Sequence, residues 1–124
     1  MEPVGKNTSH IRFVHACEDT KPVTLSCKDG YKISILYVFF GHGYGHETSC
    51  DSSIISQNCR THGAAEKVKY HCQNEQRCII DPTAKVIGST SCVFGLDADL
   101  LIRYTCNKGE KEVCFYNCLK EKEI

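Results

Sequence analysis

The sequence predicts a mainly β domain: a small, disulfide-rich antiparallel β-sandwich with one or two short helices. Three observations lead to this class. The chain has 124 residues, a size at which a single hydrophobic core is usual. Its ten cysteines approach the density that marks a disulfide scaffold in a short secreted chain. Residues 31–40 consist mostly of Tyr, Ile, Val and Phe, and these side chains suit a pleated, half-buried strand.

Charge and cysteine content narrow the location and the partners. Fifteen Lys and Arg residues balance fifteen Asp and Glu residues, so no general field draws the chain to nucleic acid or anionic membranes. No apolar run approaches the roughly 18 residues of a membrane-spanning helix, and we expect no membrane insertion by this segment. Thiols at this density stay paired only in oxidising compartments. We therefore expect an extracellular protein, either secreted or the ectodomain of a larger membrane protein.

The first ten residues are predicted to form a flexible N-terminal arm. Residues 1–10 contain no apolar segment and no small-residue cleavage pattern, so they do not resemble a signal peptide. The chain looks like a mature or excised ectodomain. Asn7 begins an Asn-Thr-Ser sequon, which makes it a candidate glycosylation site on an exposed arm.

The first half of the chain contains three predicted strands, at residues 11–17, 23–27 and 31–40. Ile11, Phe13 and His15 share one face of the first strand, and we expect His15 to be a packed strand residue. Only an Asp-Gly turn at residues 28–30 separates the second strand from the third. Strands joined this tightly are expected to be antiparallel neighbours.

A glycine-spaced loop follows the long strand. Gly41, Gly43 and Gly45 remove side chains at alternate positions and allow backbone angles that are closed to other residues. The strand is therefore expected to deliver an exposed loop that carries Tyr44 and His46. Loops held by a rigid strand are a usual place for a binding site.

The second half of the chain is predicted to alternate loops with short elements. We expect a surface loop at residues 51–62, a helix at 64–75, a short strand at 78–80, irregular chain at 83–91 and a last strand at 100–106. The helix is predicted because Ala64, Ala65, Val68 and Cys72 fall on one side of it. Residues 107–124 form a charged C-terminal extension that contains Cys114 and Cys118.

The order of the cysteines resembles that of a known family. Ala-Cys-Glu is followed by Leu-Ser-Cys, by an aromatic strand ending in Tyr-Gly and a cysteine, by Asn-Cys, by a helical Val-x-x-x-Cys with a further cysteine, and by two cysteines framing the last strand. This order resembles the SUEL-type, rhamnose-binding or galactose-binding lectin domain family, which is also found in latrophilin-like adhesion receptors. The resemblance covers about residues 13–106, and we assign the lectin domain to residues 11–106.

The resemblance implies a disulfide pattern. The four implied pairs are Cys17–Cys50, Cys27–Cys106, Cys59–Cys92 and Cys72–Cys78. Cys114 and Cys118 lie outside the resembling region, and their spacing permits either a local bridge or links to a following domain. We favour the local bridge, Cys114–Cys118.

The resemblance also implies a sugar site. In the family, the glutamate after the first cysteine, the tyrosine of a YGR motif, an asparagine, the aspartate of a DPC motif and the lysine of a KYL motif surround the sugar. Glu18 and Tyr44 match the first two, and a bridge from Cys50 to Cys17 is expected to bring them side by side. His46 stands in place of the arginine of YGR.

The remaining family positions differ in this chain. Lys85 aligns near the asparagine, and Gly-Ser-Thr-Ser-Cys stands where the family has Asp-Pro-Cys. Asp97 and Asp99 stand at the KYL position and replace a cation with two acids, which could substitute for the lost acceptors. Structural interpretations compete with these roles: Glu18 as a solvated turn residue, Tyr44 as a ring packed on the sandwich edge, and both aspartates as solvated side chains.

Two functional classes follow. The first is an extracellular carbohydrate-binding domain with a degenerate galactose/rhamnose-type site, which recognises a cell-surface glycan or glycoprotein. The alternative is a protein–protein adhesion or receptor-binding module on the same fold, with no sugar bound. We expect no enzyme and no cofactor, because no nucleophile motif or paired carboxylates point to an assembled site. His42 and His46 could hold zinc only with a third ligand that the sequence does not supply, so no metal is expected.

Overall fold

The computed structural model describes residues 10–45, 50, 58–90, 92 and 97–108. Its elements follow the order β2 (Arg12–Cys17), β3 (Val23–Ser26), β4 (Tyr31–His42), β5 (Cys59–Arg60), α1 (Ala64–Cys72), β6 (Arg77–Ile80), α2 (Ala84–Ile87) and β7 (Asp99–Lys108). The fold is mainly β, antiparallel and rich in disulfides, as the sequence predicts. Asn7, Cys114 and Cys118 lie outside the described residues.

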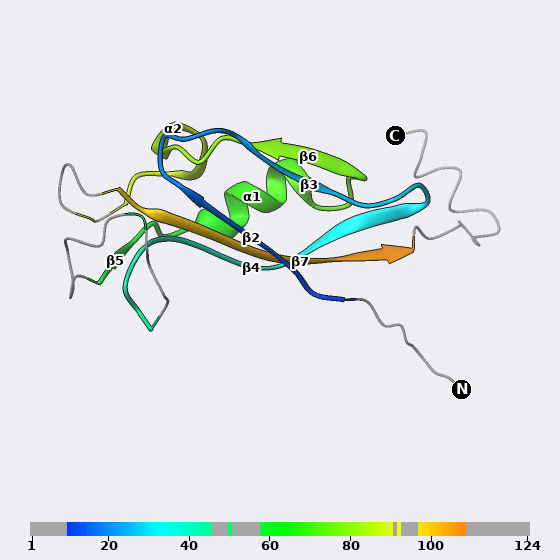
Figure 1. The fold of residues 1–124 in the computed structure, drawn as a ribbon, viewed down its shortest axis with the longest axis horizontal. Helices are drawn as coiled ribbons and strands as arrows, with labels where there is room; N and C mark the ends of the chain where they lie inside the picture. The colour runs from blue at the N-terminus through cyan, green and yellow to red at the C-terminus, as the bar shows by residue number, and fades with distance from the viewer. Residues whose placement is uncertain (1–9, 46–49, 51–57, 91, 93–96, 109–124) are drawn as a thin grey trace.

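Two antiparallel sheets form the framework. The larger sheet has the strand order β2-β7-β4-β5, and the smaller one pairs β3 with β6. In Figure 1, α1 is seen between the long strands β2, β4 and β7 and the β3–β6 pair. β7, from the C-terminal end of the domain, pairs with β2 on one side and β4 on the other. The two ends of the domain are therefore joined within one sheet.

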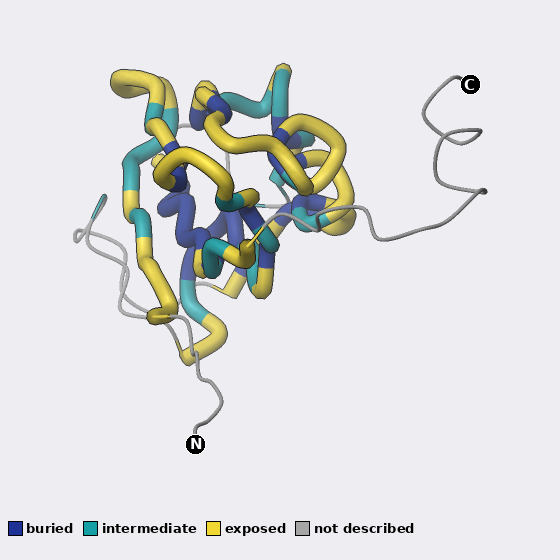
Figure 2. Tube along the Cα trace, turned by 90° about the vertical axis from the view of Figure 1, so that its right-hand side faces the viewer, coloured by how far each residue is buried: buried dark blue, intermediate teal, exposed yellow. Residues whose placement is uncertain are grey.

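The hydrophobic core lies between the larger sheet and the layer made by α1, β3 and β6. Ile33 and Phe40 of β4 are fully buried, and Val68 of α1 and Leu25 of β3 meet them in the same cluster. Figure 2 shows the buried chain at the centre and the exposed chain around it. Each such side chain contributes about 1.5–3 kcal/mol when it leaves water, so the helix and both sheets depend on one another.

The prediction that the second and third strands pair is wrong. β3 pairs with β6, and β4 pairs with β7 and β5. The turn between them is present, since Tyr31 N donates to Lys28 O at 3.0 Å, but Cys27 N donates across to Gln76 O at 2.8 Å. A tight turn specifies a reversal of the chain, whereas burial of Leu25 in the core determines which strand β3 pairs with.

The large residues of the first strand share one face, as predicted, but this face is exposed, so His15 is not the packed residue that was expected. Ile11 and Phe13 are 63% and 55% exposed, and His15 is also exposed. Val14 and Ala16 pack against the core instead. Because successive strand residues point to opposite faces, the small residues of β2 face inward and the large ones cover the outer surface of the sheet.

Helix boundaries differ from the prediction at two places. α1 ends at Cys72, because Gln73 is extended (φ −61°, ψ 129°) and Asn74 has φ 67°. Residues 83–91, predicted to be irregular, contain α2. Its N-cap is Thr83, whose side chain accepts a hydrogen bond from Val86 N at 3.2 Å. The predicted loop at residues 51–62 also contributes the short strand β5.

Four disulfides cross-link the described chain: Cys17–Cys50, Cys27–Cys106, Cys59–Cys92 and Cys72–Cys78. These are the four pairs that the family resemblance implies. Cys27–Cys106 connects the chain just after β3 to β7 and so joins the two layers. Cys17–Cys50 attaches residue 50 to the end of β2, beside the candidate site.

Candidate functional site

The candidate site lies where three neighbouring strands end. In the register of the larger sheet, Cys17 of β2 lies opposite Asp99 of β7, and Asp99 lies opposite Gly41 of β4. Glu18 follows the first of these strands, and Tyr44 follows the third. Neighbouring strands are about 4.8 Å apart, so β7 separates the strands that carry Glu18 and Tyr44 by about 10 Å. The two retained family residues therefore flank the start of β7.

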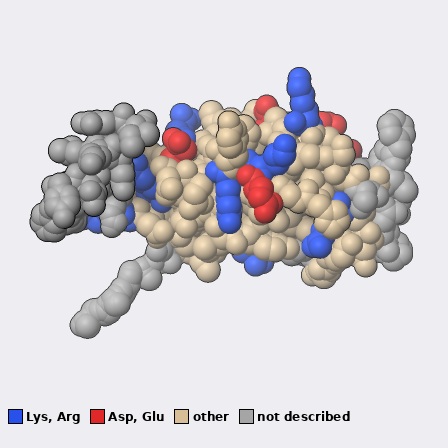
Figure 3. Space-filling view, turned by 180° about the vertical axis from the view of Figure 1, so that it is seen from behind, with Lys and Arg blue, Asp and Glu red and all other residues tan. Residues whose placement is uncertain are grey.

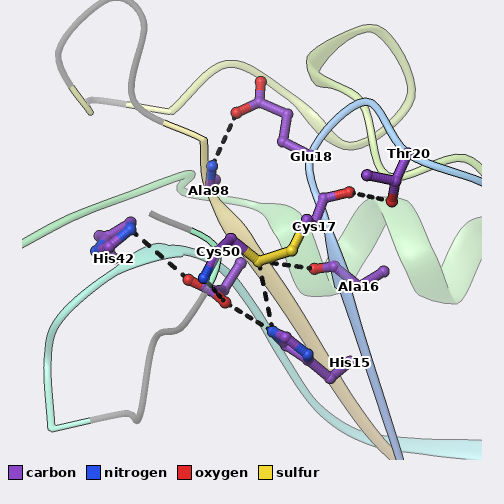
Figure 4. The surroundings of a disulfide bond; sticks show 9 residues. His15, Ala16, Cys17, Glu18, Thr20, His42, Cys50 and Ala98 are labelled. Atoms are coloured by element: carbon purple, nitrogen blue, oxygen red, sulfur yellow. Dashed lines mark hydrogen bonds and ion pairs between the residues drawn. A yellow bond between two sulfur atoms is a disulfide. The ribbon is translucent and has the colours of Figure 1, made fainter. Parts of the chain in front are cut away.

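Glu18 is held in place by the chain that leads into β7. Its backbone N donates to Ala98 O at 2.9 Å, and its side-chain Oε1 accepts from Ala98 N at 3.0 Å. Figure 4 shows the carboxylate reaching toward Ala98. Glu18 is half-buried and is not simply a solvated turn residue. One carboxylate oxygen is committed to the backbone, and this fixes the direction of the whole group.

Asp99 is fully buried, so the expectation that both aspartates are solvated is wrong for this residue. Its Oδ1 accepts from His15 Nε2 at 2.6 Å and from Cys50 N at 3.2 Å. Its Oδ2 lies 3.7 Å from Nε2 of His42, which is also buried. In Figure 4, His15, His42 and Cys50 lie together around the Cys17–Cys50 disulfide, with dashed lines marking their contacts. The carboxylate therefore links β2, β4, β7 and residue 50.

Tyr44 stands at the exposed tip beyond β4. Its φ of 56° is left-handed, and its N–H donates to Asn58 Oδ1 at 2.8 Å. The ring is 50% exposed and meets Phe39 edge to face, with centroids 6.2 Å apart. The guanidinium carbon of Arg60 lies 4.9 Å from the Tyr44 ring centroid. The ring thus packs on the sheet edge and still presents half of its surface.

Arg60 is a member of the site that the sequence analysis missed. It directly follows Cys59, and no motif distinguishes it from a surface arginine. Only the pairing of β4 with β5, which places Arg60 opposite Gly41, brings it to Tyr44. The short strand β5 carries too few residues to show a periodic signal. Its position could not have been read from the sequence alone.

The other predicted site residues are more scattered. Lys85 is exposed on α2, and Asp97 is exposed just before β7. His46 lies outside the described residues.

The histidine–carboxylate cluster resembles a metal site only in composition. His15, Cys17, Cys50 and Asp99 place potential ligand atoms within 4.8 Å of one another. Both sulfurs belong to one disulfide, and zinc is bound by thiolates. The two remaining groups, His15 and Asp99, are hydrogen-bonded to each other. The donor set therefore suits a structural cross-link of strands rather than a cation.

Comparison with known proteins gives a family. A search of curated proteins found no match to the chain. Across the described residues, no helix is long and apolar enough to cross a membrane. The profile of the D-galactoside/L-rhamnose binding SUEL lectin domain matches residues 25–106, which are more than half of the chain. Cys17 and Glu18 precede the matched residues but lie at the same end of the sheet as Tyr44. The chain belongs to the SUEL lectin domain family, a family of carbohydrate-binding lectins.

Proposed function

We propose that this domain is an extracellular glycan-binding module whose sugar site is altered from the family pattern, and that it serves recognition or adhesion. The observation that carries the proposal is the placement of Glu18 and Tyr44 on either side of β7, in a chain of this lectin family. The four disulfides support an extracellular location, because such cross-links persist in oxidising environments. The partner would be a cell-surface glycan or glycoprotein.

The two residues offer complementary chemistry to a sugar. A carboxylate accepts hydrogen bonds from sugar hydroxyls, and charge makes these bonds stronger than neutral ones. Glu18 is already oriented by Ala98, so little side-chain entropy remains to be lost on binding. The half-exposed ring of Tyr44 offers an apolar face to the carbon side of a pyranose.

The altered positions favour weak binding. Where the family carries a lysine, Asp97 is exposed, whereas Asp99 is buried and hydrogen-bonded to His15. Asp99 therefore contributes to the site by fixing the strands that carry it. Asp97 and Lys85 are exposed and could contact a ligand at the edge of the site. With fewer converging groups, we expect a dissociation constant near the millimolar end of the scale, about −4 kcal/mol. Multivalent display would then be needed for adhesion.

A glycan array read with matched variants tests the proposal. Glu18→Gln keeps an oxygen for Ala98 N and removes the charge, while Tyr44→Ala removes the ring. We expect each variant to give at least fivefold less array signal than the unmodified domain. For Glu18→Gln the reason is that a charged hydrogen bond contributes about 1.5–3 kcal/mol. For Tyr44→Ala the reason is the loss of the ring that packs on the sugar. Glu75→Gln, an exposed glutamate between α1 and β6, is the control and should bind as the unmodified domain does. If the unmodified domain binds no glycan on the array, the proposal is wrong.

A second candidate function is protein recognition without sugar. On the outer face of the larger sheet, Phe13, Arg103 and Tyr37 are opposite one another on β2, β7 and β4. The Arg103 guanidinium carbon lies 5.8 Å from the Phe13 ring centroid and 5.4 Å from that of Tyr37. Arginine and aromatic side chains are the types enriched at the energetic centres of protein interfaces. A silent array together with cell binding that Phe13→Ala abolishes would favour this function.

A further inference from the structure

We propose that a groove between the edge of β4 and the start of α1 is a second sugar subsite, which holds one neutral pyranose ring next to Tyr44. This inference rests on the proposed glycan binding and adds a site to it. Glu18 and Tyr44 are not among the residues that line the groove, and the lining residues are not those that match the family's sugar-binding motifs.

The groove is formed where β5 stops pairing with β4. β5 pairs with Gly41 and His42 of β4, and the earlier β4 residues Tyr37–Phe39 form one wall. The opposite wall is made by residues 60–63 and the first turn of α1. The groove has a volume of about 220 Å³ and is half open to solvent. Pockets for drug-sized ligands measure about 300–1,000 Å³, so this smaller groove suits a single ring rather than a larger molecule.

The lining offers both donors and acceptors, as a sugar requires. Arg60, His62 and Glu66 are exposed side chains on the groove, while Val38, Ala64 and Ala65 give it apolar surface. A guanidinium is a donor only, and an ionised carboxylate is an acceptor only. Both groups lie on the same wall, so Arg60 can donate to one sugar hydroxyl while Glu66 accepts from a neighbouring one, and the apolar residues meet ring carbons.

The balance of charge favours a neutral ligand. Arg60 and Glu66 carry opposite charges on the same groove, so neither an acidic nor a basic group finds a field of one sign. Acidic and basic side chains are likewise interspersed over the face of the molecule in Figure 3. Hexoses and deoxyhexoses without carboxylate or sulfate groups fit this lining best.

The groove is held rigidly by contacts on its far side. Thr61 is buried, its N donates to Phe40 O at 2.9 Å, and its Oγ1 donates to Gly88 O at 3.1 Å. A Cβ added to Gly41 would lie 2.0 Å from Cys59 O, which shows how closely the two strands approach. The disulfide Cys59–Cys92 secures the same segment. A wall fixed before the ligand arrives lowers the entropic cost of binding.

Arg60 connects the groove to Tyr44. Its guanidinium carbon lies over the Tyr44 ring, 4.9 Å from the centroid, and the same side chain lines the groove. A guanidinium carries five N–H donors, so one Arg60 side chain has donors enough for more than one sugar hydroxyl. A sugar ring in the groove and a neighbouring sugar ring on Tyr44 could therefore both accept hydrogen bonds from Arg60. The expected ligand is a glycan with two adjacent neutral units.

Amide chemical-shift mapping of the isotope-labelled domain tests this inference. Methyl β-galactoside and methyl α-rhamnoside are titrated separately, each to about ten times a millimolar dissociation constant. We expect shifts at the amides of residues 60–66 as well as at Tyr44. Glu66→Gln should weaken the groove response at least fivefold, and Ala65→Leu, which fills the groove with a good helix former, should abolish it. Glu75→Gln and Lys67→Leu are the matched controls and should change nothing.

The outcomes separate the two proposals. If either sugar shifts only the amides around Glu18 and Tyr44, or if the groove response survives Ala65→Leu in a domain with an otherwise native spectrum, the groove is not a subsite and the glycan-binding proposal stands. If neither sugar shifts any amide and the glycan array is silent, both are overturned.

Discussion

Asp99 is a carboxylate withdrawn fully from water at the point where the candidate site is built. A buried charge is expensive unless hydrogen bonds compensate for it. His15 Nε2 at 2.6 Å and Cys50 N at 3.2 Å supply two such bonds, and each partner lies on a different segment of the chain. Asp99 therefore acts on the site through other groups, by fixing the ends of β2 and β7.

The pair formed by Asp99 and His15 can be measured. Asp99→Asn removes the charge and weakens both bonds, so we expect a loss of about 1.5–3 kcal/mol in the free energy of unfolding, the worth of hydrogen bonds to a charged group. His15→Gln should cost less, because His15 lies on the exposed side of β2. Urea unfolding of the two single variants and the double variant gives the coupling energy. Strictly additive losses would show that the contact does not stabilise the domain.

At the residue level, the sequence named candidates where a sequence neighbour marked them, and their roles in binding stay predictions. Glu18 was identified because it follows Cys17, and Tyr44 because it follows a strand and stands between glycines. Arg60 and the burial of Asp99 could not be predicted in this way. Both depend on which strand lies next to which, and the pairing of β2 with β7 joins residues more than eighty positions apart.

At the level of elements, long patterned segments were predictable and short ones were not. β4 and α1 carry enough β-branched, aromatic or periodic residues to be recognised, and only their ends differ from prediction. α2 and β5 have four and two residues, about one period of a helix and of a strand, so neither can show a repeating pattern. α2 exists because Thr83 caps it and Ile87 is buried in the core.

The cap on α2 provides a test at this level. Thr83→Ala removes the side-chain acceptor of Val86 N, and we expect the free energy of unfolding to fall by about 0.5–2 kcal/mol, as for other helix caps. Thr83→Ser keeps the hydroxyl and should stay within about 0.5 kcal/mol of the unmodified domain. Thermal or urea unfolding measures both. Equal losses for the two variants would mean that the methyl group of Thr83, rather than its hydroxyl, stabilises the turn.

For the whole molecule, the disulfides decide how far the unfolded chain can expand. Cys27–Cys106 closes a loop of 79 residues and Cys72–Cys78 a loop of 6. In the chain-entropy model these loops correspond to about 4.5 and about 2 kcal/mol of stabilisation. We expect the double variant Cys27→Ala/Cys106→Ala to lose more stability than Cys72→Ala/Cys78→Ala, although Cys72 is the more deeply buried cysteine.

The slope of the unfolding free energy against urea should also rise more for the first variant, because removing the long-range link exposes more chain on unfolding. Core packing at Cys72 would not produce that change of slope. An unchanged slope in the first variant would show that Cys27–Cys106 stabilises the folded layers directly rather than by restricting the unfolded chain.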